Sequence, residues 1–297
     1  MKYLKLWGML IFAVLIFSGC VAKNQTIQAD LNTKAVQTEP VLPSLDERIQ
    51  ISVNSLKLVF VEAGTFMMGA DAESPGHKVI LTRDYFISAY EITFDLYDLY
   101  CESAQKVKPK DEGWGRGERP VMWVSWLNAK DFCNWLSINS GLDPCYSGIT
   151  CDFSKNGYRL PSEAEWEFAA RGGKHSRNFI YSGSDVLDEV GWYSENTETT
   201  QAVGQKKPNE LGIYDMSGNL FEFCNDWYLK GYYEISPEIN PAGPMRTEID
   251  TTYGGKRVRR GSNFNYDEDS ARVVHRSAEE LKGKDFGMGF RIVRNAM

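Results

Sequence analysis

Glycine, asparagine and aromatic residues dominate the chain from about Arg171 to its C-terminus. No stretch of that half repeats its apolar residues with the helical period of about 3.6. We therefore expect short strands and long ordered loops there, because turn-forming residues interrupt any longer element. With 297 residues, 42% hydrophobic and 13% aromatic, the chain can bury one sizeable core. This favours a single large domain with tails and excludes disorder throughout.

Three helices are expected before this region. Thr93 can cap the first and Ser125 the second, which ends before Gly141. Ser162 begins a third, short helix, because Ser162 and Glu165 have the spacing of a capping box. The apolar residues at helical spacing are Leu96, Leu99 and Tyr100 in the first helix and Trp126, Ala129, Phe132, Cys133 and Leu136 in the second. Strands are expected at residues 56–62, 79–81 and 85–87.

The N-terminus carries an export signal. Residues 1–19 have a basic start, an apolar run of about a dozen residues and the small pair Ser18-Gly19 before Cys20. The run is shorter than the roughly 20 residues of a spanning helix. Ser18-Gly19-Cys20 resembles a bacterial lipobox, which predicts lipid attachment at Cys20; an ordinary secretory cleavage site is the alternative. Residues 20–50 are polar and poorly periodic, which predicts a lipid-anchored flexible tether.

Acidic residues outnumber basic ones. The signal holds two of the 33 lysines and arginines, so 31 face 40 aspartates and glutamates in the exported chain, and its net charge is −9. Nucleic acid is therefore not an expected partner. One basic cluster lies in a strand-like stretch, where we expect it to be solvated or salt-bridged. Its members are Lys256, Arg257, Arg259 and Arg260.

Five cysteines remain after Cys20, and export makes disulfides chemically possible. Cys145 and Cys151 bracket a short polar loop and are the most plausible pair. The odd total leaves at least one thiol free or paired elsewhere.

Seven phrases, spread in order over the chain after residue 51, carry a resemblance to a known family. They are VEAGTFMMG at 61–69, YFISAYEIT at 85–93, RPVMWVSW at 119–126, YRLPSEAEWEFAARGG at 158–173, NELGIYDMSGNLFEF at 209–223, RGSNF at 260–264 and GFR at 289–291. Residues 51–297 resemble the formylglycine-generating-enzyme, or sulfatase-modifying-factor, family. The resemblance implies an α+β, C-type-lectin-like fold with two main helices, a small mixed sheet and many ordered loops.

The same resemblance bears on catalysis. Enzymes of this family oxidise a substrate cysteine with two cysteines that follow a Gly-Gly-Ser-aromatic motif. Alignment on residues 261–264 places Asn265 and Ser270 at those positions. Neither an amide nor a hydroxyl supplies a soft thiolate ligand or forms a disulfide. His77, His175 and His275 are too scattered to suggest a replacement metal site, so we expect no enzyme activity and no catalytic cofactor.

A polar window replaces the family's catalytic cysteines. Its members are Asn263, Asn265, Tyr266, Asp267, Asp269, Ser270, His275 and Ser277. A solvated loop would use the same residue types. However, Asn, Asp, Tyr, Ser and His can all be reached from an AAY codon by changing only adenines. This resembles the variable region of proteins diversified by a retroelement, among them a treponemal surface lipoprotein, and implies an exposed ligand-binding face within about residues 261–291.

The resemblance also implies a structural calcium site. Family members bind calcium near the Tyr-Asp-Met-Ser-Gly-Asn phrase, and the matching positions here are Asp215, the carbonyls of Gly218 and Leu220, and Glu222. Oxygen ligands of this kind suit a hard cation. The alternative is that Asp215 and Asn219 cap a turn while Glu222 pairs with an arginine.

The favoured hypothesis is a non-enzymatic, surface-displayed binding lipoprotein with a diversified face. Its ligand would be a protein or another cell-surface molecule, and its location the cell envelope, at the outer membrane or cell surface. One alternative is a structural lipoprotein of the envelope or of surface motility. A less favoured one is a metal-dependent oxygenase, against which the histidine spacing argues.

Overall fold

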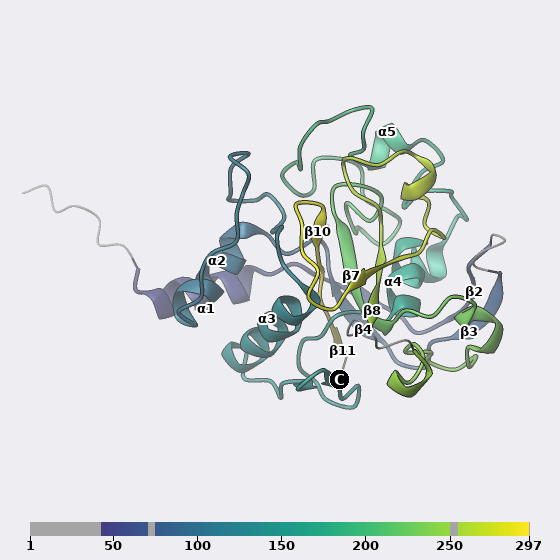
Figure 1. The fold of residues 1–297 in the computed structure, drawn as a ribbon, viewed down its shortest axis with the longest axis horizontal. Coiled ribbons are helices and arrows are strands. Elements are labelled where there is room, and N and C mark those ends of the chain that lie inside the picture. Colours follow the sequence, from purple (N-terminus) through teal and green to yellow (C-terminus); the bar gives the residue numbers. More distant parts are fainter. Residues whose placement is uncertain (1–42, 71–74, 250–254, 297) are drawn as a thin grey trace, which may run out of the picture. The chain divides into compact units, whose positions relative to one another are not determined.

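The computed structural model describes residues 43–70, 75–249 and 255–296 (Figure 1). The helices are α1 (Leu45–Ser55), α2 (Phe94–Ser103), α3 (Trp126–Asn139), α4 (Glu163–Ala170), α5 (Leu187–Val190) and α6 (Tyr232–Ile235), with short 3₁₀ turns at Gly173–His175, Arg246–Glu248 and Asp269–Ala271. The strands are β1 (Leu58–Val61), β2 (Thr65–Met68), β3 (His77–Ile80), β4 (Tyr85–Ser88), β5 (Tyr146–Ser147), β6 (Thr150–Cys151), β7 (Phe221–Trp227), β8 (Lys256–Arg260), β9 (Ser277–Glu280), β10 (Met288–Gly289) and β11 (Val293–Asn295). Among these described helices, none is long and apolar enough to cross a membrane.

Two small sheets form the centre of the domain. The first has the order β10-β7-β8-β9 and is mixed, because β10 runs parallel to β7 while the other pairs are antiparallel. The second, β1-β4-β11, is antiparallel throughout. Figure 1 shows α4 beside the central strands and α1, α2 and α3 on the opposite flank. The predicted α+β fold with a small mixed sheet and long loops is confirmed.

The predicted helices form where their caps and apolar faces place them. Ser125 accepts a hydrogen bond from the Asn128 N–H at 3.3 Å at the start of α3, and Ser162 caps α4 in the same way. All eight apolar residues that the sequence assigned to the faces of α2 and α3 are buried. Thr93 stands at the N-cap of α2 but makes no side-chain hydrogen bond. The α2 helix therefore depends on burial of its apolar face.

Helix α1 corrects the predicted tether. Residues 45–50, placed in the tether by their polar character, are helical and begin with a capping box between Ser44 and Glu47. Ile49 is buried, and the Arg48 side chain pairs with Glu102 of α2 at 2.8 Å. The folded domain thus begins near residue 43 rather than 51. The predicted signal at residues 1–19, the lipid site Cys20 and the tether up to residue 42 lie outside the described residues.

The terminal Gly-Phe-Arg phrase joins the two sheets. Arg291 donates two hydrogen bonds to the Glu222 carboxylate of β7, each at 2.6 Å, and one to the Tyr214 carbonyl at 2.8 Å. A Cβ on Gly289 would lie 2.7 Å from the Leu220 side chain, so glycine is required for this close approach. Phe290 packs in the core against α3. The phrase is therefore explained by packing and by one buried ion pair.

Cys145 and Cys151 face each other across the β5–β6 hairpin. Both are thiols in the structure, and the Cys151 thiol is the largest influence on the Cys145 pKa, which lies below its ordinary value. Burial raises the pKa of Cys133 and of Cys224 well above the ordinary range. The disulfide between Cys145 and Cys151 stays a prediction, with both partners in place.

Candidate ligand-binding face

The loop that follows β8 is exposed, and the residues just before it are buried. Residues 265–269 are exposed, whereas residues 261–264 before them are buried. The Tyr266 side chain is 42% exposed, yet its ring makes an edge-to-face contact with the buried Phe221 ring at a centroid distance of 5.1 Å. An aromatic ring held from below and open above is suited to contact with another molecule.

Asn263 corrects the predicted face. Its side chain is only 5% exposed, its Oδ1 accepts the Asn265 N–H at 2.9 Å, and its Nδ2 donates to the Gly287 carbonyl at 3.4 Å. Ser262, just before it, has a positive φ of 67°. These residues turn the chain out of β8 and fix the start of the loop, so Asn263 is a support for the face rather than a contact residue.

Asn265 and Ser270, the positions that the family resemblance aligns with the enzymes' two cysteines, lie in this loop. Asn265 is exposed, and the Ser270 hydroxyl donates to the Asp267 carboxylate at 2.9 Å. The Ser270 side chain and backbone hydrogen bonds hold the pKa of Asp267 below its ordinary value. The carboxylate is therefore charged at neutral pH. With its exposed neighbours Glu268 and Asp269, it makes the outer part of the loop acidic.

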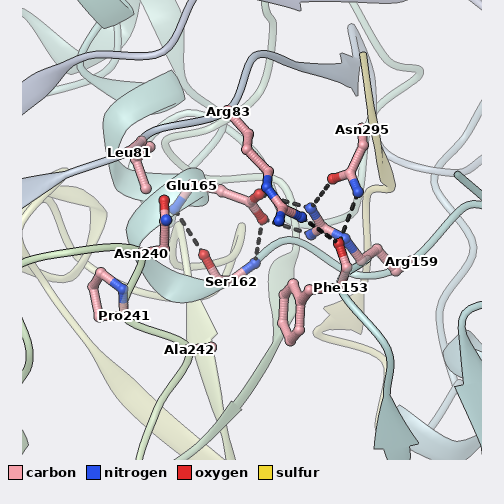
Figure 2. A pocket seen from close by; sticks show the side chains of 10 residues that line it. All are labelled: Leu81, Arg83, Phe153, Arg159, Ser162, Glu165, Asn240, Pro241, Ala242 and Asn295. Atoms are coloured by element: carbon pink, nitrogen blue, oxygen red, sulfur yellow. Dashed lines mark hydrogen bonds and ion pairs between the residues drawn. The ribbon is translucent and has the colours of Figure 1, made fainter. Parts of the chain in front are cut away.

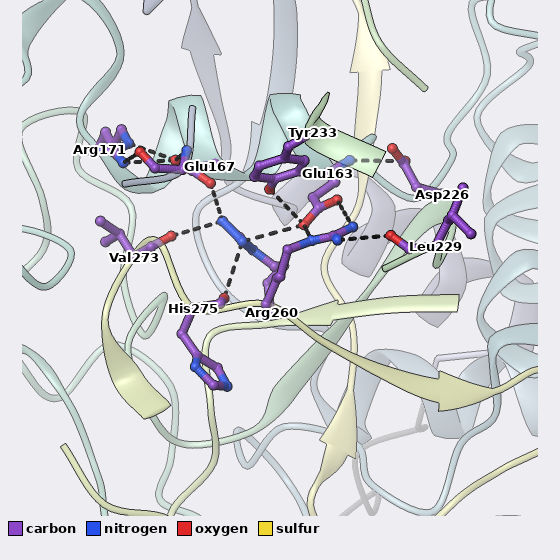
Figure 3. A network of polar contacts seen from close by, with 11 residues as sticks. Glu163, Glu167, Arg171, Asp226, Leu229, Tyr233, Arg260, Val273 and His275 are labelled. Carbon is purple, nitrogen blue, oxygen red and sulfur yellow. Dashed lines mark hydrogen bonds and ion pairs between the residues drawn. The ribbon is translucent and has the colours of Figure 1, made fainter. Parts of the chain in front are cut away.

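The loop returns to the core over a network of buried charges (Figure 3). Arg260, at the end of β8, is fully buried and pairs with Glu167 of α4. It also donates to the carbonyls of Val273 and His275, at 2.8 and 3.1 Å. A single guanidinium therefore fixes the backbone that follows the exposed loop, because its planar donors reach several acceptors at once.

Glu163, at the start of α4, completes this network. Arg276 contacts both of its carboxylate oxygens at 2.8 Å. Burial raises the Glu163 pKa, but the charges of Arg276 and Arg260 outweigh burial and hold the pKa below its ordinary value. For the nearby Asp226, burial and the charge of Glu163 raise the pKa well above the ordinary range. The charges are thus paired around Glu163, and the loop rests on a rigid base.

His275 and Ser277 lie at the edge of the face. Both side chains are partly exposed. The Ser277 hydroxyl accepts a hydrogen bond from Arg259 at 3.0 Å, within the β8–β9 pair. Arg259 also pairs with Glu279 at 3.3 Å, which confirms part of the salt-bridged role predicted for the basic cluster. Arg257 instead lies between two indole rings, 3.8 Å from the Trp126 centroid and 3.5 Å from that of Trp227.

An aromatic cluster beside the loop was missed by the sequence reasoning. Phe264 contacts Trp114 at 5.3 Å and Phe286 at 6.0 Å between ring centroids. Phe286 is 38% exposed and reaches Trp123 at 6.5 Å. The cluster joins three loops far apart in the chain, and no local spacing signals such an arrangement. It extends the candidate face from Tyr266 towards residues 110–123.

The residues predicted to bind calcium lie at the turn into β7. Both oxygens of Glu222 accept from Arg291, and the Trp166 indole donates to one of them at 2.7 Å. Glu222 is therefore an ion-pair partner, as the alternative to the calcium site predicts, and the calcium assignment stays a prediction. In Asp215, Oδ2 accepts the Gly204 N–H at 2.7 Å, whereas the buried Oδ1 has no partner in the described part of the chain. The described residues contain no cluster of three metal-binding side chains.

A separate cleft of about 240 Å³ lies between the start of α4 and β11 (Figure 2). Arg159 lines it and forks onto Glu165 at 2.6 and 2.7 Å. The same guanidinium donates to Asn295 at 2.9 Å and stacks over Phe153 at 4.7 Å. These contacts tie α4 to the C-terminal strand. No residue of the predicted site lines this cleft.

Comparisons with known proteins agree with this architecture. A sulfatase-modifying factor enzyme 1-like domain matches residues 48–296. The structure is similar to Treponema denticola variable protein 1, with a TM-score of 0.68, 29% identity, and coverage of 81% of this chain and 95% of that one. PvdO from Pseudomonas aeruginosa, at 24% identity and a TM-score of 0.66, shares the fold over 80% of this chain and 94% of that one.

Two curated relatives are also similar. Chaperone protein LppX of Paenibacillus barcinonensis is 31% identical over 275 residues, 80% of this chain and 89% of that protein. The formylglycine-generating enzyme of Streptomyces coelicolor is 31% identical over 199 residues, 61% of this chain and 54% of that protein. The family match covers the described domain almost from end to end. The chain therefore belongs to the family of sulfatase-modifying factor enzyme 1-like domains.

Proposed function

We propose that this chain is a non-enzymatic, surface-displayed ligand-binding lipoprotein of the cell envelope, with a C-terminal face diversified by a retroelement. The observation that carries the proposal is the exposed loop 265–269, which with Ser270 spans the positions that the family resemblance aligns with the enzymes' two cysteines. Asn265 and Ser270 lack the thiolate needed for copper and oxygen chemistry. The similarity to a Treponema variable protein supports the same conclusion.

The geometry of the loop suits a protein in which many different residues can occupy the same surface positions. The loop's outer residues make few contacts with the rest of the domain, whereas Arg260 and Asn263 hold its two ends. A substitution on the outer loop, apart from Tyr266 with its contact to Phe221, therefore changes the surface with little effect on stability, because exposed positions away from buried contacts change the unfolding free energy by only about 0.5 kcal/mol. Protein or other cell-surface ligands are the expected partners, since Tyr266 and Asn265 combine contact area with adaptable hydrogen bonding.

Binding of the purified chain to an array of cell-surface proteins tests the proposal. We expect the double variant Asn265→Ala/Tyr266→Ala to lose about ten-fold or more in affinity for any bound protein, because a central aromatic contact carries about 1–2 kcal/mol or more of binding energy. The exposed pair Lys155→Ala/Glu234→Ala, outside the loop and the aromatic cluster, is the matched control. Equal unfolding temperatures show that both variants are folded.

Two outcomes would contradict this function. Stable association with envelope proteins that the loop variants do not change would favour a structural lipoprotein. Iron or copper retained in stoichiometric amount after metal reconstitution would favour an oxygenase.

A chaperone is a second candidate, supported by the similarity to Chaperone protein LppX over 89% of that protein's length. In this case the face would bind an incompletely folded partner protein rather than a fixed surface ligand. Suppression of the aggregation of a denatured enzyme by the purified chain tests this candidate. Suppression by both the wild-type chain and the loop double variant would place the chaperone surface elsewhere.

A further inference from the structure

A basic groove adjoins the candidate face. It has a volume of about 530 Å³ and lies between α2 and the loop that leads into α3. Four of its lining residues are Lys106, Lys108, Lys110 and Lys284, and no acidic side chain lines it among the described residues. The chain as a whole has a net charge of −7. Two of these ammonium groups are neutralised by carboxylates of neighbouring helices, so the positive charge that the groove offers comes from Lys110 and Lys284.

Two of the lysines are held in place from outside the groove. Lys108 pairs with Glu102 and Asp98 of α2 at 2.8 and 3.5 Å, and Lys106 pairs with Asp131 of α3 at 3.7 Å. Lys110 and Lys284 form no ion pair with any described residue, so their ammonium groups are available to an anion. Lys110 lies 5.4 Å from the centre of the Trp123 ring.

Trp123 supplies an independent observation. It is a bulky residue with a positive φ of 59°, and its indole N–H is buried without a hydrogen-bond acceptor in the described part of the chain. Such a conformation costs about 1–3 kcal/mol and is concentrated at functional sites. The Trp123 backbone N–H donates to the Asp285 carbonyl at 2.8 Å, next to Lys284. The strained residue thus joins the two loops that carry the unpaired lysines.

We propose that this groove binds an extended acidic segment of a protein ligand. Residues 106–110 lie outside helices and strands, and all five line the groove, so this segment forms one of its walls. The two lysines without an ion pair, Lys110 and Lys284, also line it. Carboxylates of an acidic peptide laid along this wall can therefore pair with the ammonium groups of Lys110 and Lys284.

The groove is a fixed subsite beside the variable loop, and this assignment rests on the proposed binding function. Phe286 links the two, because its ring contacts both Trp123 of the groove and Phe264 beneath the loop. The fixed groove selects the class of ligand by charge, and the variable loop selects among its members. Acidic polypeptides would bind through the groove whatever residues the loop carries.

The test uses the full chain and a fluorescent peptide with glutamate at alternate positions. We expect Lys110→Gln/Lys284→Gln to weaken peptide binding about ten-fold, because each exposed charge pair contributes about 0.2–1 kcal/mol. The control Lys256→Gln/Lys282→Gln removes two exposed lysines outside the groove and should leave the affinity unchanged. Added salt should weaken the wild-type interaction, since the charges are at the surface.

Equal peptide affinity in the two double variants would overturn the proposal. Binding of heparin with no binding of the peptide would overturn it in favour of a sulfated polysaccharide. The loop variant Asn265→Ala/Tyr266→Ala separates the two hypotheses. If it still loses its array ligand while the groove variants keep the peptide, the groove assignment fails and the binding function stands. If the groove variants lose the peptide while the loop variant keeps its array ligand, the groove assignment stands and the binding function of the loop fails.

Discussion

At the scale of single residues, the domain holds several buried charged side chains. Whether each has a partner decides how it affects the stability of the fold. Asp215 is a buried carboxylate with an incomplete set of partners, because its Oδ1 has no hydrogen bond within the described structure. Burial raises its pKa from 3.8 to about 6. Its φ of 58° lies in the left-handed region, which asparagine adopts as readily as aspartate.

The substitution Asp215→Asn should therefore stabilise the metal-free protein at neutral pH. Since the folded-state pKa is raised, the Asp215 contribution is fully present below about pH 4 and is lost as the pH rises through about 6. A shift of this size corresponds to at most about 3 kcal/mol. Thermal unfolding measured from pH 4 to 7.5 in a chelator should show a smaller loss of stability in the variant. A lower unfolding temperature for the variant at pH 7.5 would contradict this account.

Calcium gives the same position a second test. If Asp215 binds calcium, added calcium should raise the unfolding temperature of the wild-type chain and have little effect on Asp215→Asn, because the ion then binds only the folded wild type. An equal response of both chains would exclude Asp215 as the ligand.

Loss of the Arg291 side chain should lower stability strongly. It is fully buried, and its removal would leave the Glu222 carboxylate uncompensated in the core. We expect Arg291→Ala to lower the unfolding free energy by about 3–5 kcal/mol. The exposed substitution Lys282→Ala should change it by less than about 0.5 kcal/mol. Urea unfolding of both variants measures the difference, and a similar small change in both would show that the ion pair contributes little.

At the scale of elements, the sequence predicted the helices whose starts are set by local hydrogen bonds. Helices α3 and α4 carry side-chain caps, so Ser125 and Ser162 identified where they begin. Helix α1 was missed because Asp46, Glu47 and Arg48 at its start continue the polar stretch before it, and only Ile49 is fully buried. Asn263 was assigned to the face because an asparagine in a loop has the same sequence signal whether it is buried or exposed. The partners of Arg260 and Arg291 are distant in sequence, and no spacing predicts such pairs.

The segment that follows the exposed loop should depend on Arg260. The variant Arg260→Lys keeps the charge but cannot bond Glu167 and the carbonyls of Val273 and His275 together, because an ammonium lacks the guanidinium's planar fork. Backbone amides of residues 265–276 should then exchange their hydrogens faster, while α3 stays protected. Hydrogen exchange followed by mass spectrometry resolves the two regions. A uniform change across the domain would show that Arg260 stabilises the whole fold rather than this segment.

At the scale of the whole molecule, different parts of the fold form the buried base and the exposed loop. Two sheets joined by the Arg291–Glu222 pair form the base, and the loop after β8 lies at the surface beside α5 (Figure 1). The C-terminal strand β11 lies elsewhere, against β4. The sequence predicted the fold class and the position of the loop through family phrases. It did not predict the aromatic cluster or the basic groove, which arise from contacts between distant loops.

The central claim is that the exposed residues of this loop vary while their buried base does not. The most direct measurement is to sequence the 3′ end of the gene across isolates, and to compare codons 261–291 with any near-copy in the genomic neighbourhood. We expect differences confined to template adenines and concentrated at the exposed positions from Asn265 to Ser270, with Gly261, Phe264 and Arg291 unchanged. An invariant 3′ end without a template, or changes spread equally over buried positions, would contradict the account.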